Sequence, residues 1–209
     1  MLVEPMRDRR AERHSETRQD ILDAAWAMVR AEGLAGLSLR DLAHRVGMRA
    51  PSLYSYFASK NAIFDAMFAQ GARAYLEGQA AVSVTGDPLR DLQAGMRFFF
   101  DFATQDPSRY QLLFQRTVPG FEPSAESFAL SVEGLEAMRE RLHSIGVTAP
   151  RALDLLTAID TGLTAQQLSN DPGGDRWSRL VDEAAEMFIA YQARQHSLPQ
   201  ASPRRRSTS

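Results

Sequence analysis

The sequence predicts an all-α protein of nine helices, and three observations support that fold class. Apolar residues recur at helical spacing in nearly every segment, and no segment shows the alternating pattern of a half-buried strand. Capping residues, prolines and glycines punctuate the chain at regular intervals. The 209 residues, 44% of them hydrophobic and 24% charged, are enough to bury a substantial core in one domain or two small ones.

Helix-capping residues divide the first 82 residues into four expected helices. Thr17 and Asp20 have capping-box spacing before an apolar stripe, and Gly33 suits the end of that helix. Ser38 opens a short second helix in the same way, and Pro51 suits the first turn of a third. The four helices are expected over residues 17–32, 39–46, 51–57 and 59–82.

Prolines and glycines divide the rest of the chain into five more helices. Asp87-Pro88 and Asp106-Pro107 each open a helix, whereas residues 117–123 and 170–174 are typical of a loop and a turn. The five helices are expected over residues 88–104, 107–116, 124–144, 150–169 and 175–194. The two ends, residues 1–13 and 196–209, lack apolar periodicity, so we expect them to be disordered.

Composition excludes several function classes. The chain has no cysteine, which excludes disulfide scaffolds, thiol nucleophiles and cysteine-bound metals. Its four histidines lack metal-ligand spacing and no glycine-rich phosphate loop follows a strand, so no catalytic residue, metal or cofactor is expected. No apolar run is long enough to span a membrane, and Arg9-Arg10 precedes no apolar export segment. We therefore expect a cytoplasmic protein that is not an enzyme.

Charge is unevenly distributed along the chain. Residues 1–60 hold nine Arg and one Lys against eight acidic residues, whereas residues 61–195 hold eleven Arg against eighteen acidic residues. Within residues 33–60, four basic residues stand against Asp41 alone. A basic segment on an acidic body can bind a polyanion through that end, although ordinary scatter of surface charge would look similar.

The first sixty residues have the pattern of a helix-turn-helix. Three helices follow one another, and a tight turn at Gly47 joins the second to the third. The apolar positions that would pack these helices together are Ile21, Ala25, Met28, Leu39, Leu42, Ala43, Val46, Met48, Leu53 and Phe57. The residues left outward on the third helix are small or able to form hydrogen bonds, which suits a helix presented to a DNA groove.

The stretch from Gly47 to Ile63, GMRAPSLYSYFASKNAI, resembles the recognition-helix signature of TetR-type transcriptional regulators. That signature runs Gly-Val-x-x-x-x-Leu-Tyr-x-His-Phe, then two residues and Lys, and the one lysine of this chain, Lys60, falls on the lysine position. The upstream residues also look like the first two helices of that family. The resemblance implies a DNA-binding domain over residues 14–64 and a larger helical domain for effector binding and dimerisation over residues 65–195.

The resemblance also implies which residues meet DNA. The second helix begins beside the groove, the start of the third lies nearest the bases, and Lys60 contacts a backbone phosphate. Arginine, hydroxyl groups and helix N-termini suit these roles chemically. The implied DNA-binding residues are Ser38, Arg40, Arg49, Ala50, Pro51, Ser52, Tyr54, Tyr56 and Lys60.

Two of these residues depart from the family pattern. Tyr56 replaces the usual histidine, and Ala50 offers no hydrogen bond where many members have a polar group, so the operator sequence is not predicted. Other roles stay open for three positions. Tyr54 could serve mainly to pack its helix, Tyr56 could be partly core, and Arg40 could pair with nearby acids.

The later helices carry candidate dimer and effector surfaces. Apolar stripes on the last two helices suit an isologous four-helix interface, although the same stripes would also suit the intrachain core. The candidate interface residues are Leu155, Ile159, Gly162, Leu163, Val181, Ala184 and Phe188. Dense aromatic residues suit an apolar effector pocket, with an aromatic core as the alternative. The candidate pocket residues are Gln93, Met96, Arg97, Phe100, Tyr110, Gln111, Phe114 and Phe128.

Together these features predict a homodimeric regulator that binds a palindromic operator in double-stranded DNA. Its expected mode is repression that an unidentified small-molecule effector relieves. The alternatives are an activator, a ligand-independent regulator, or a helical ligand-binding protein or enzyme with a vestigial helix-turn-helix. The arginines within residues 7–13 and at 204–206 could reach a minor groove or belong to plain disordered ends.

Overall fold

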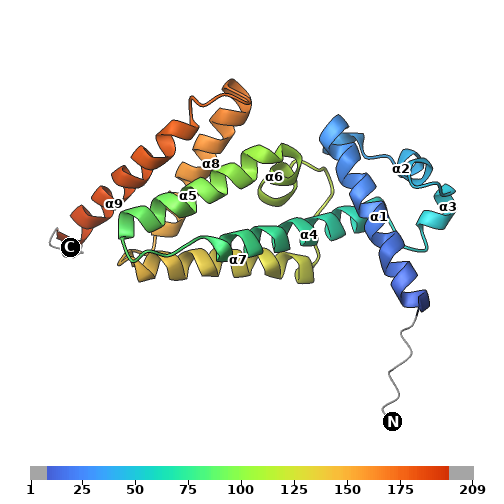
Figure 1. Cartoon of the computed structure of the whole chain (residues 1–209), viewed down its shortest axis with the longest axis horizontal. Coiled ribbons are helices and arrows are strands. Elements are labelled where there is room, and N and C mark those ends of the chain that lie inside the picture. Colours follow the sequence, from blue (N-terminus) through green and yellow to red (C-terminus); the bar gives the residue numbers. More distant parts are fainter. Residues whose placement is uncertain (1–8, 198–209) are drawn as a thin grey trace, which may run out of the picture. The chain divides into compact units, whose positions relative to one another are not determined.

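The computed structural model describes residues 9–197, whose regular structure is nine α-helices and two short 3-10 helices with no strand among them (Figure 1). The α-helices are α1 Arg9–Glu32, α2 Leu39–Arg45, α3 Ala50–Leu53, α4 Lys60–Ala81, α5 Pro88–Gln105, α6 Pro107–Phe114, α7 Ala125–Ser144, α8 Ala152–Asn170 and α9 Val181–Ser197. The 3-10 helices are η1 Leu34–Gly36 and η2 Ser178–Leu180. The predicted all-α class is confirmed.

The described chain divides into two compact units. The first unit contains residues 9–81 and 102–135, and the second contains residues 82–101 and 136–197. Helices α4 and α6 therefore belong to the same unit as α1, α2 and α3, and α5 and α7 pass from one unit into the other.

The first helix is longer than predicted. It begins at Arg9 instead of Thr17, so residues 9–13 are helical and their predicted disorder is wrong. Residues 9–16 consist largely of Arg, Ala and Glu, strong helix formers that sustain a helix without an apolar stripe. Gly33, with φ of +76°, follows the helix in a backbone conformation that favours glycine. The remainder of the predicted N-terminal arm, residues 1–8, lies outside the described residues.

One apolar core joins the N-terminal helices to α4 and α6. Ile21 of α1 and Phe64 of α4 are fully buried in it, and Leu112 brings α6 into the same cluster. Gly71 allows α4 and α6 to approach closely, because a Cβ at that position would lie 3.2 Å from Leu113 Cδ1. The helix-turn-helix segment is thus packed directly on the two helices that lead into the rest of the chain.

The second unit has a core of its own. Leu92 and Met96 of α5, Leu156 of α8 and Phe188 of α9 are buried together in one cluster. The loop before α5 is held by the buried carboxylate of Asp91, which accepts hydrogen bonds from the backbone N–H groups of residues 85 and 86 at 2.7 and 3.0 Å. The hydrogen bonds from Thr85 lower the pKa of this carboxyl group.

The last helix begins later than predicted because one buried side chain holds the turn before it. Gln167 donates from Nε2 to the carbonyl oxygens of Asp171 and Gly174, and its Oε1 accepts from the N–H of Trp177 at 3.1 Å. This turn leads into η2, so α9 starts at Val181 and not at residue 175. Helix α9 continues to Ser197, whereas the rest of the predicted tail, residues 198–209 with its three arginines, lies outside the described residues.

Candidate nucleic-acid interface

Residues 38–57 form a helix-turn-helix. Ser38 caps α2, and its Oγ accepts a hydrogen bond from the N–H of Asp41 at 3.4 Å. Gly47 makes the turn with φ of +68°, and the N–H of Met48 donates to the carbonyl of Ala43 at 2.8 Å. Leu42 is fully buried, so α2 is fixed on the core of the first unit. The turn therefore sets the direction of α3 from a rigid base.

Helix α3 is shorter than predicted and continues as a turn. Pro51 lies in its first turn, where the missing N–H has no intrahelical partner to lose. Leu53 and Phe57 are buried and anchor both ends of the segment on the core. Because those two side chains face inward, Ser52 and Tyr54 are left outward, and Tyr54 is 54% exposed. The segment presents small and hydroxyl-bearing groups to solvent.

The predicted DNA contacts fall into two groups by exposure. The exposed ones are Arg40, Arg49, Pro51, Ser52 and Tyr54. The half-buried ones are Ser38, Ala50, Tyr56 and Lys60. None of the nine is fully buried, so each keeps some solvent-exposed surface. Their individual roles toward DNA stay predictions.

Tyr56 has a packing role that the sequence left open. Its ring stacks on His14 of α1, with ring centroids 4.7 Å apart, and it packs against the core. Its carbonyl oxygen accepts a hydrogen bond from Arg18 at 2.8 Å, and the guanidinium of Arg18 lies over the Phe57 ring at 4.1 Å. Arg18 therefore holds the end of the recognition segment against α1. No sequence signal indicated this role, because Arg18 and Tyr56 are 38 residues apart.

Cationic groups without acidic partners surround this segment. Arg40, Arg45 and Arg49 make no ion pair or hydrogen bond through their guanidinium groups within residues 9–197. Lys60 lies in the first turn of α4, which Ser59 caps by accepting from the N–H of Ala62 at 3.1 Å, and its ammonium lies 5.5 Å from the Phe64 ring. Unpaired cations of this kind are suited to phosphate oxygens.

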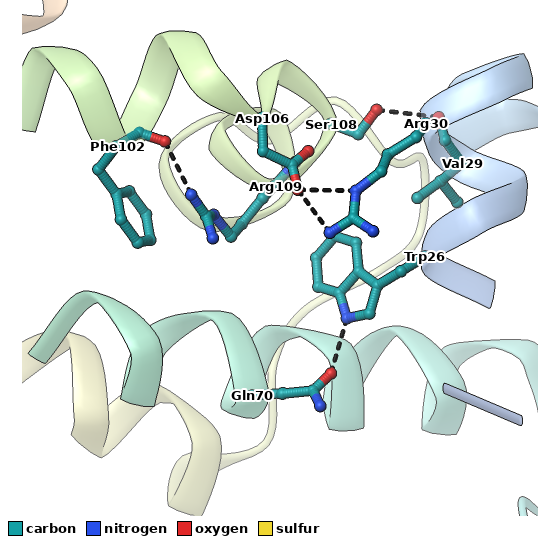
Figure 2. Close-up of polar contacts among 8 residues, drawn as sticks. All are labelled: Trp26, Val29, Arg30, Gln70, Phe102, Asp106, Ser108 and Arg109. Carbon is teal, nitrogen blue, oxygen red and sulfur yellow. Dashed lines mark hydrogen bonds and ion pairs between the residues drawn. The ribbon is translucent and has the colours of Figure 1, made fainter. Parts of the chain in front are cut away.

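Polar contacts tie α1 to α4 and α6 (Figure 2). Arg30 donates from Nε and from a terminal nitrogen to one carboxylate oxygen of Asp106, at 2.9 and 2.8 Å. Ser108 donates its hydroxyl to the carbonyl of Val29 at 2.9 Å. These partners are 76 and 79 residues apart in sequence, so no local pattern could have revealed them.

A further contact joins α1 to α4. The indole N–H of Trp26, a buried residue, donates to Oε1 of Gln70 at 2.7 Å (Figure 2). The same region has a polar cleft of about 370 Å³. Its lining residues are Asp23, Trp26, Arg30, Gln70, Gly71, Ala74 and Arg109. Arg109 donates to the carbonyl of Phe102 at 3.0 Å, and burial lowers its pKa. The base of the helix-turn-helix is thus joined to the following helices by directional bonds as well as apolar packing.

The predicted effector-pocket residues are divided between the two units. Gln93, Met96, Arg97 and Phe100 lie in the second unit, and Tyr110, Gln111, Phe114 and Phe128 lie in the first. Two of them do not fit a pocket lining. Arg97 is exposed and pairs with Asp182 at 2.5 Å, which raises the pKa of Arg97. Phe128 is 52% exposed on α7 because the spacing of that helix turns it outward. Met96 and Phe100 belong to the apolar core of the second unit.

The predicted dimer residues also separate into two sets. Val181, Ala184 and Phe188 are buried in the core of the second unit, so this stripe of α9 serves the protomer itself and its assignment to an interface is corrected. The four candidates on α8 remain at least partly exposed to solvent in the protomer. Leu155 and Gly162 are exposed, and Ile159 and Leu163 are half-buried. The large apolar side chains that α9 leaves exposed are Met187 and Tyr191.

The described residues thus define an all-α protein with an N-terminal helix-turn-helix. None of their helices is long and apolar enough to cross a membrane. Within the same residues, no group of three or more His, Asp or Glu side chains is placed to hold a metal ion. The site has the features of a DNA-binding module.

Comparison with known proteins assigns the family. Residues 21–67 match the sequence profile of bacterial regulatory proteins of the tetR family. A curated relative, the HTH-type transcriptional activator FasR of Mycolicibacterium smegmatis, is 27% identical over 149 residues, which cover 64% of this chain and 68% of the relative. The chain belongs to the TetR family and is a DNA-binding transcriptional regulator. Such regulators are not enzymes.

Solved structures share the fold. A bacterial regulatory protein of the tetR family from Rhodococcus RHA1 superposes with a TM-score of 0.66 at 15% identity, covering 83% of this chain and 97% of that one. AibR, solved in complex with isovaleryl coenzyme A and operator DNA, superposes with a TM-score of 0.61 at 17% identity, covering 82% and 97%. At these identities the likeness concerns the fold alone.

Proposed function

We propose that this chain is a cytoplasmic homodimeric repressor that binds a palindromic operator and is released from it by a small-molecule effector. The observation that carries the proposal is the helix-turn-helix of residues 38–57, with exposed hydroxyl groups on α3 and unpaired cations on both sides. The nine residues from Ser38 to Lys60 named above would make the contacts. Hydroxyl groups and arginines can reach base edges and phosphates, and Lys60 suits a phosphate.

Dimerisation follows from the small size of the recognition segment. One short helix reads only a few base pairs, so a useful site needs two copies about 34–36 Å apart on a palindrome. The outward face of α8, with Leu155 and Gly162, and the exposed Met187 and Tyr191 of α9 support a two-fold interface built from these two helices. A Cβ at Gly162 would meet no atom within 4 Å in the protomer, which leaves room for a partner helix to approach.

Release by an effector needs a link between a ligand site and the helix-turn-helix. The bonds of Arg30 to Asp106, Ser108 to Val29 and Trp26 to Gln70 supply a directional link from α6 and α4 to α1. An effector that binds better to one placement of α4 and α6 would shift the spacing of the two recognition helices, by no more than its differential affinity. AibR, which shares the fold, was solved in complex with isovaleryl coenzyme A and operator DNA, which supports a fold able to bind both a small molecule and DNA.

Activation is a second candidate mode. The curated relative from Mycolicibacterium smegmatis is named a transcriptional activator, which favours this alternative. The DNA contacts would be the same in either mode, so the position of the operator separates the two. A repressor site overlaps its promoter, whereas an activator site lies upstream of it.

The proposal is tested by selecting bound fragments of the source genome with the purified protein at low and at high salt. We expect enrichment of a palindromic site whose occupancy falls as salt rises, because phosphate contacts release counterions. Native mass spectrometry of the same sample reports the oligomeric state and any co-purified ligand. A ligand-free protein that enriches no site would overturn the proposal, and a monomer on a non-palindromic site would overturn its dimeric form.

A further inference from the structure

The inward face of α8 changes from apolar to polar along its length. Its buried residues are Ala152, Leu156, Asp160, Thr164 and Gln167, spaced three or four residues apart. This spacing places them on one face of the helix. Ala152 and Leu156 join the apolar core of the second unit, and half-buried Ile159 and Leu163 pack against the same core. Asp160 and Thr164 follow Leu156 in the buried series, next to half-buried Ile159 and Leu163.

Asp160 and Thr164 are buried polar groups with no partner among the described residues. Asp160 is 7% exposed, and its carboxylate takes part in no hydrogen bond or ion pair within residues 9–197. Thr164 is fully buried, and its Oγ1 has no hydrogen-bond partner. Gln167, one turn further along, differs because its amide is bonded to the turn before α9. Among the buried polar residues of α8, those without a partner are therefore confined to one turn.

Packing alone does not account for a carboxyl group at this position. Burial is the only cause that acts on Asp160, and it raises the pKa of this group to about 8. A buried acid without a partner lowers stability, whereas leucine at the same position would add to it. Buried, unpaired ionisable groups of this kind are concentrated at ligand and catalytic sites. The Asp160 carboxyl group is thus suited to a partner that the chain itself does not provide.

We propose that Asp160 and Thr164 form the polar end of the effector site and take the primary ammonium group of an otherwise apolar small molecule. The inference rests on the proposed effector-controlled function and adds the chemical class of the effector. An ammonium group has three N–H donors, of which one can bond to the carboxylate and another to Oγ1 of Thr164. When the ammonium binds, the Asp160 carboxyl group releases its proton to solvent and the resulting ion pair is held by a charge-assisted hydrogen bond. An anionic effector would gain no ion pair there, because it would meet Asp160 only as the neutral acid.

Three probes of one shape and different charge test this inference on the full chain. They are 4-phenylbutylamine, 4-phenylbutanol and 4-phenylbutyrate, and their affinities are measured by isothermal titration calorimetry. In the wild type we expect the amine to bind at least about tenfold more tightly than the alcohol, and the acid to bind weakest. The wild-type measurement alone can overturn the inference, either by equal affinity for amine and alcohol or by binding of none of the three probes.

Variants assign the preference to residues. Asp160→Asn, which is nearly isosteric, should reduce the preference for the amine to less than about threefold, and Thr164→Val should reduce it partly. Asp154→Asn, an exposed position on the same helix, is the matched control and should leave the preference unchanged. A preference that persists in Asp160→Asn would place the ammonium elsewhere. Circular dichroism of each variant checks that the helices are intact.

Operator binding is measured separately, so the two hypotheses can fail separately. If the amine preference depends on Asp160 and the protein selects no operator, the ligand site stands and the regulatory function does not. If the protein selects an operator and the three probes bind alike, the function stands and the ammonium site is wrong. If both hold, the amine should also lower operator affinity in the wild type and not in Asp160→Asn.

Discussion

Arg30 and Asp106, 76 residues apart in the chain, are joined by two hydrogen bonds of 2.9 and 2.8 Å to the same carboxylate oxygen. The Asp106 side chain is 8% exposed, whereas that of Arg30 is 54% exposed. Asp106 also caps α6, because its other oxygen accepts from the N–H of Arg109 at 3.1 Å. One carboxylate thus starts α6 and holds the end of α1, which connects the helix-turn-helix to the rest of the chain.

Removal of this ion pair should measurably weaken the first unit. Arg30→Ala leaves a nearly buried carboxylate with only its backbone partner, so we expect the free energy of unfolding to fall by about 1–2 kcal/mol. Urea denaturation measures the change. Arg139→Ala removes an arginine from an ion pair with both side chains about half exposed, and it should cost less than about 0.5 kcal/mol. Equal losses in the two variants would show that the pair with Asp106 contributes no more than a surface contact.

Lys60 should contribute to DNA affinity without contributing to sequence preference. The ammonium has no acidic partner among the described residues and lies in the first turn of α4, where a phosphate contact carries no base information. Lys60→Ala should weaken binding to operator and to random DNA alike and lower the slope of log affinity against log salt by about one unit. Fluorescence anisotropy at several salt concentrations measures both. Lys60→Arg is the control and should retain the slope, while an unchanged slope in Lys60→Ala would remove the phosphate role.

The two tyrosines of the recognition segment should respond differently to truncation. Tyr54 is mostly exposed, so Tyr54→Ala should lower operator affinity about tenfold and change the free energy of unfolding by less than about 0.5 kcal/mol. Tyr56 stacks on His14, so Tyr56→Ala should lower the free energy of unfolding by about 1–2 kcal/mol. Thermal denaturation and operator titration of both variants separate the two roles. A loss of stability in Tyr54→Ala and a loss of operator affinity alone in Tyr56→Ala would assign packing to Tyr54 and DNA contact to Tyr56.

Local signals predicted the helices that they accompany. Ser38 does cap α2 and Asp106 does cap α6, because a capping side chain acts on backbone within three residues of itself. The beginning of α1 was missed because helix propensity alone extends it beyond its apolar stripe. The contact of Arg30 with Asp106 was not predictable, because it depends on how α1 and α6 pack.

The faces of α9 show the limit of periodicity. The helix has two apolar sets, one with Val181 and Phe188 and one with Met187 and Tyr191. Both repeat at helical spacing, so the pattern indicates two apolar faces without saying which is inward. Packing in the second unit buries the first set and leaves the second exposed. Of the dimer candidates, those on α8 therefore stay proposals, and those on α9 move to its other face.

A charge placed on the outward face of α8 should test the proposed dimer. Because a Cβ at Gly162 meets no atom within 4 Å, Gly162→Glu should leave the protomer folded. In a two-fold interface the new carboxylate would approach its own copy, so we expect the dimer to dissociate and operator affinity to fall with it. Sedimentation velocity measures the oligomeric state. Thr157→Glu, exposed on α8 but about 140° around the helix from Gly162, is a control for added charge alone. A dimer that survives Gly162→Glu would move the interface to another surface.

The buried carboxyl group of Asp160 should make stability depend on pH in an identifiable direction. Its pKa is raised to about 8 in the folded chain, against about 3.9 for an unfolded aspartate. Between these values the unfolded chain has lost the proton and the folded chain has kept it, so the free energy of unfolding falls as pH rises. This group therefore lowers the free energy of unfolding by about 1.4 kcal/mol per pH unit, and the loss is complete once the pH exceeds the folded pKa.

Other groups titrate as well, so the comparison is with Asp160→Asn, which lacks the ionisable group. Its stability relative to the wild type should increase from pH 5 to pH 7, as measured by urea denaturation at each pH. Asp154→Asn, exposed on the same helix, should show the same dependence of unfolding free energy on pH as the wild type. If the free energy of unfolding of Asp160→Asn changes with pH as that of the wild type does, the carboxyl group is not buried in the folded protein. An ammonium site at that position would then lose its physical basis.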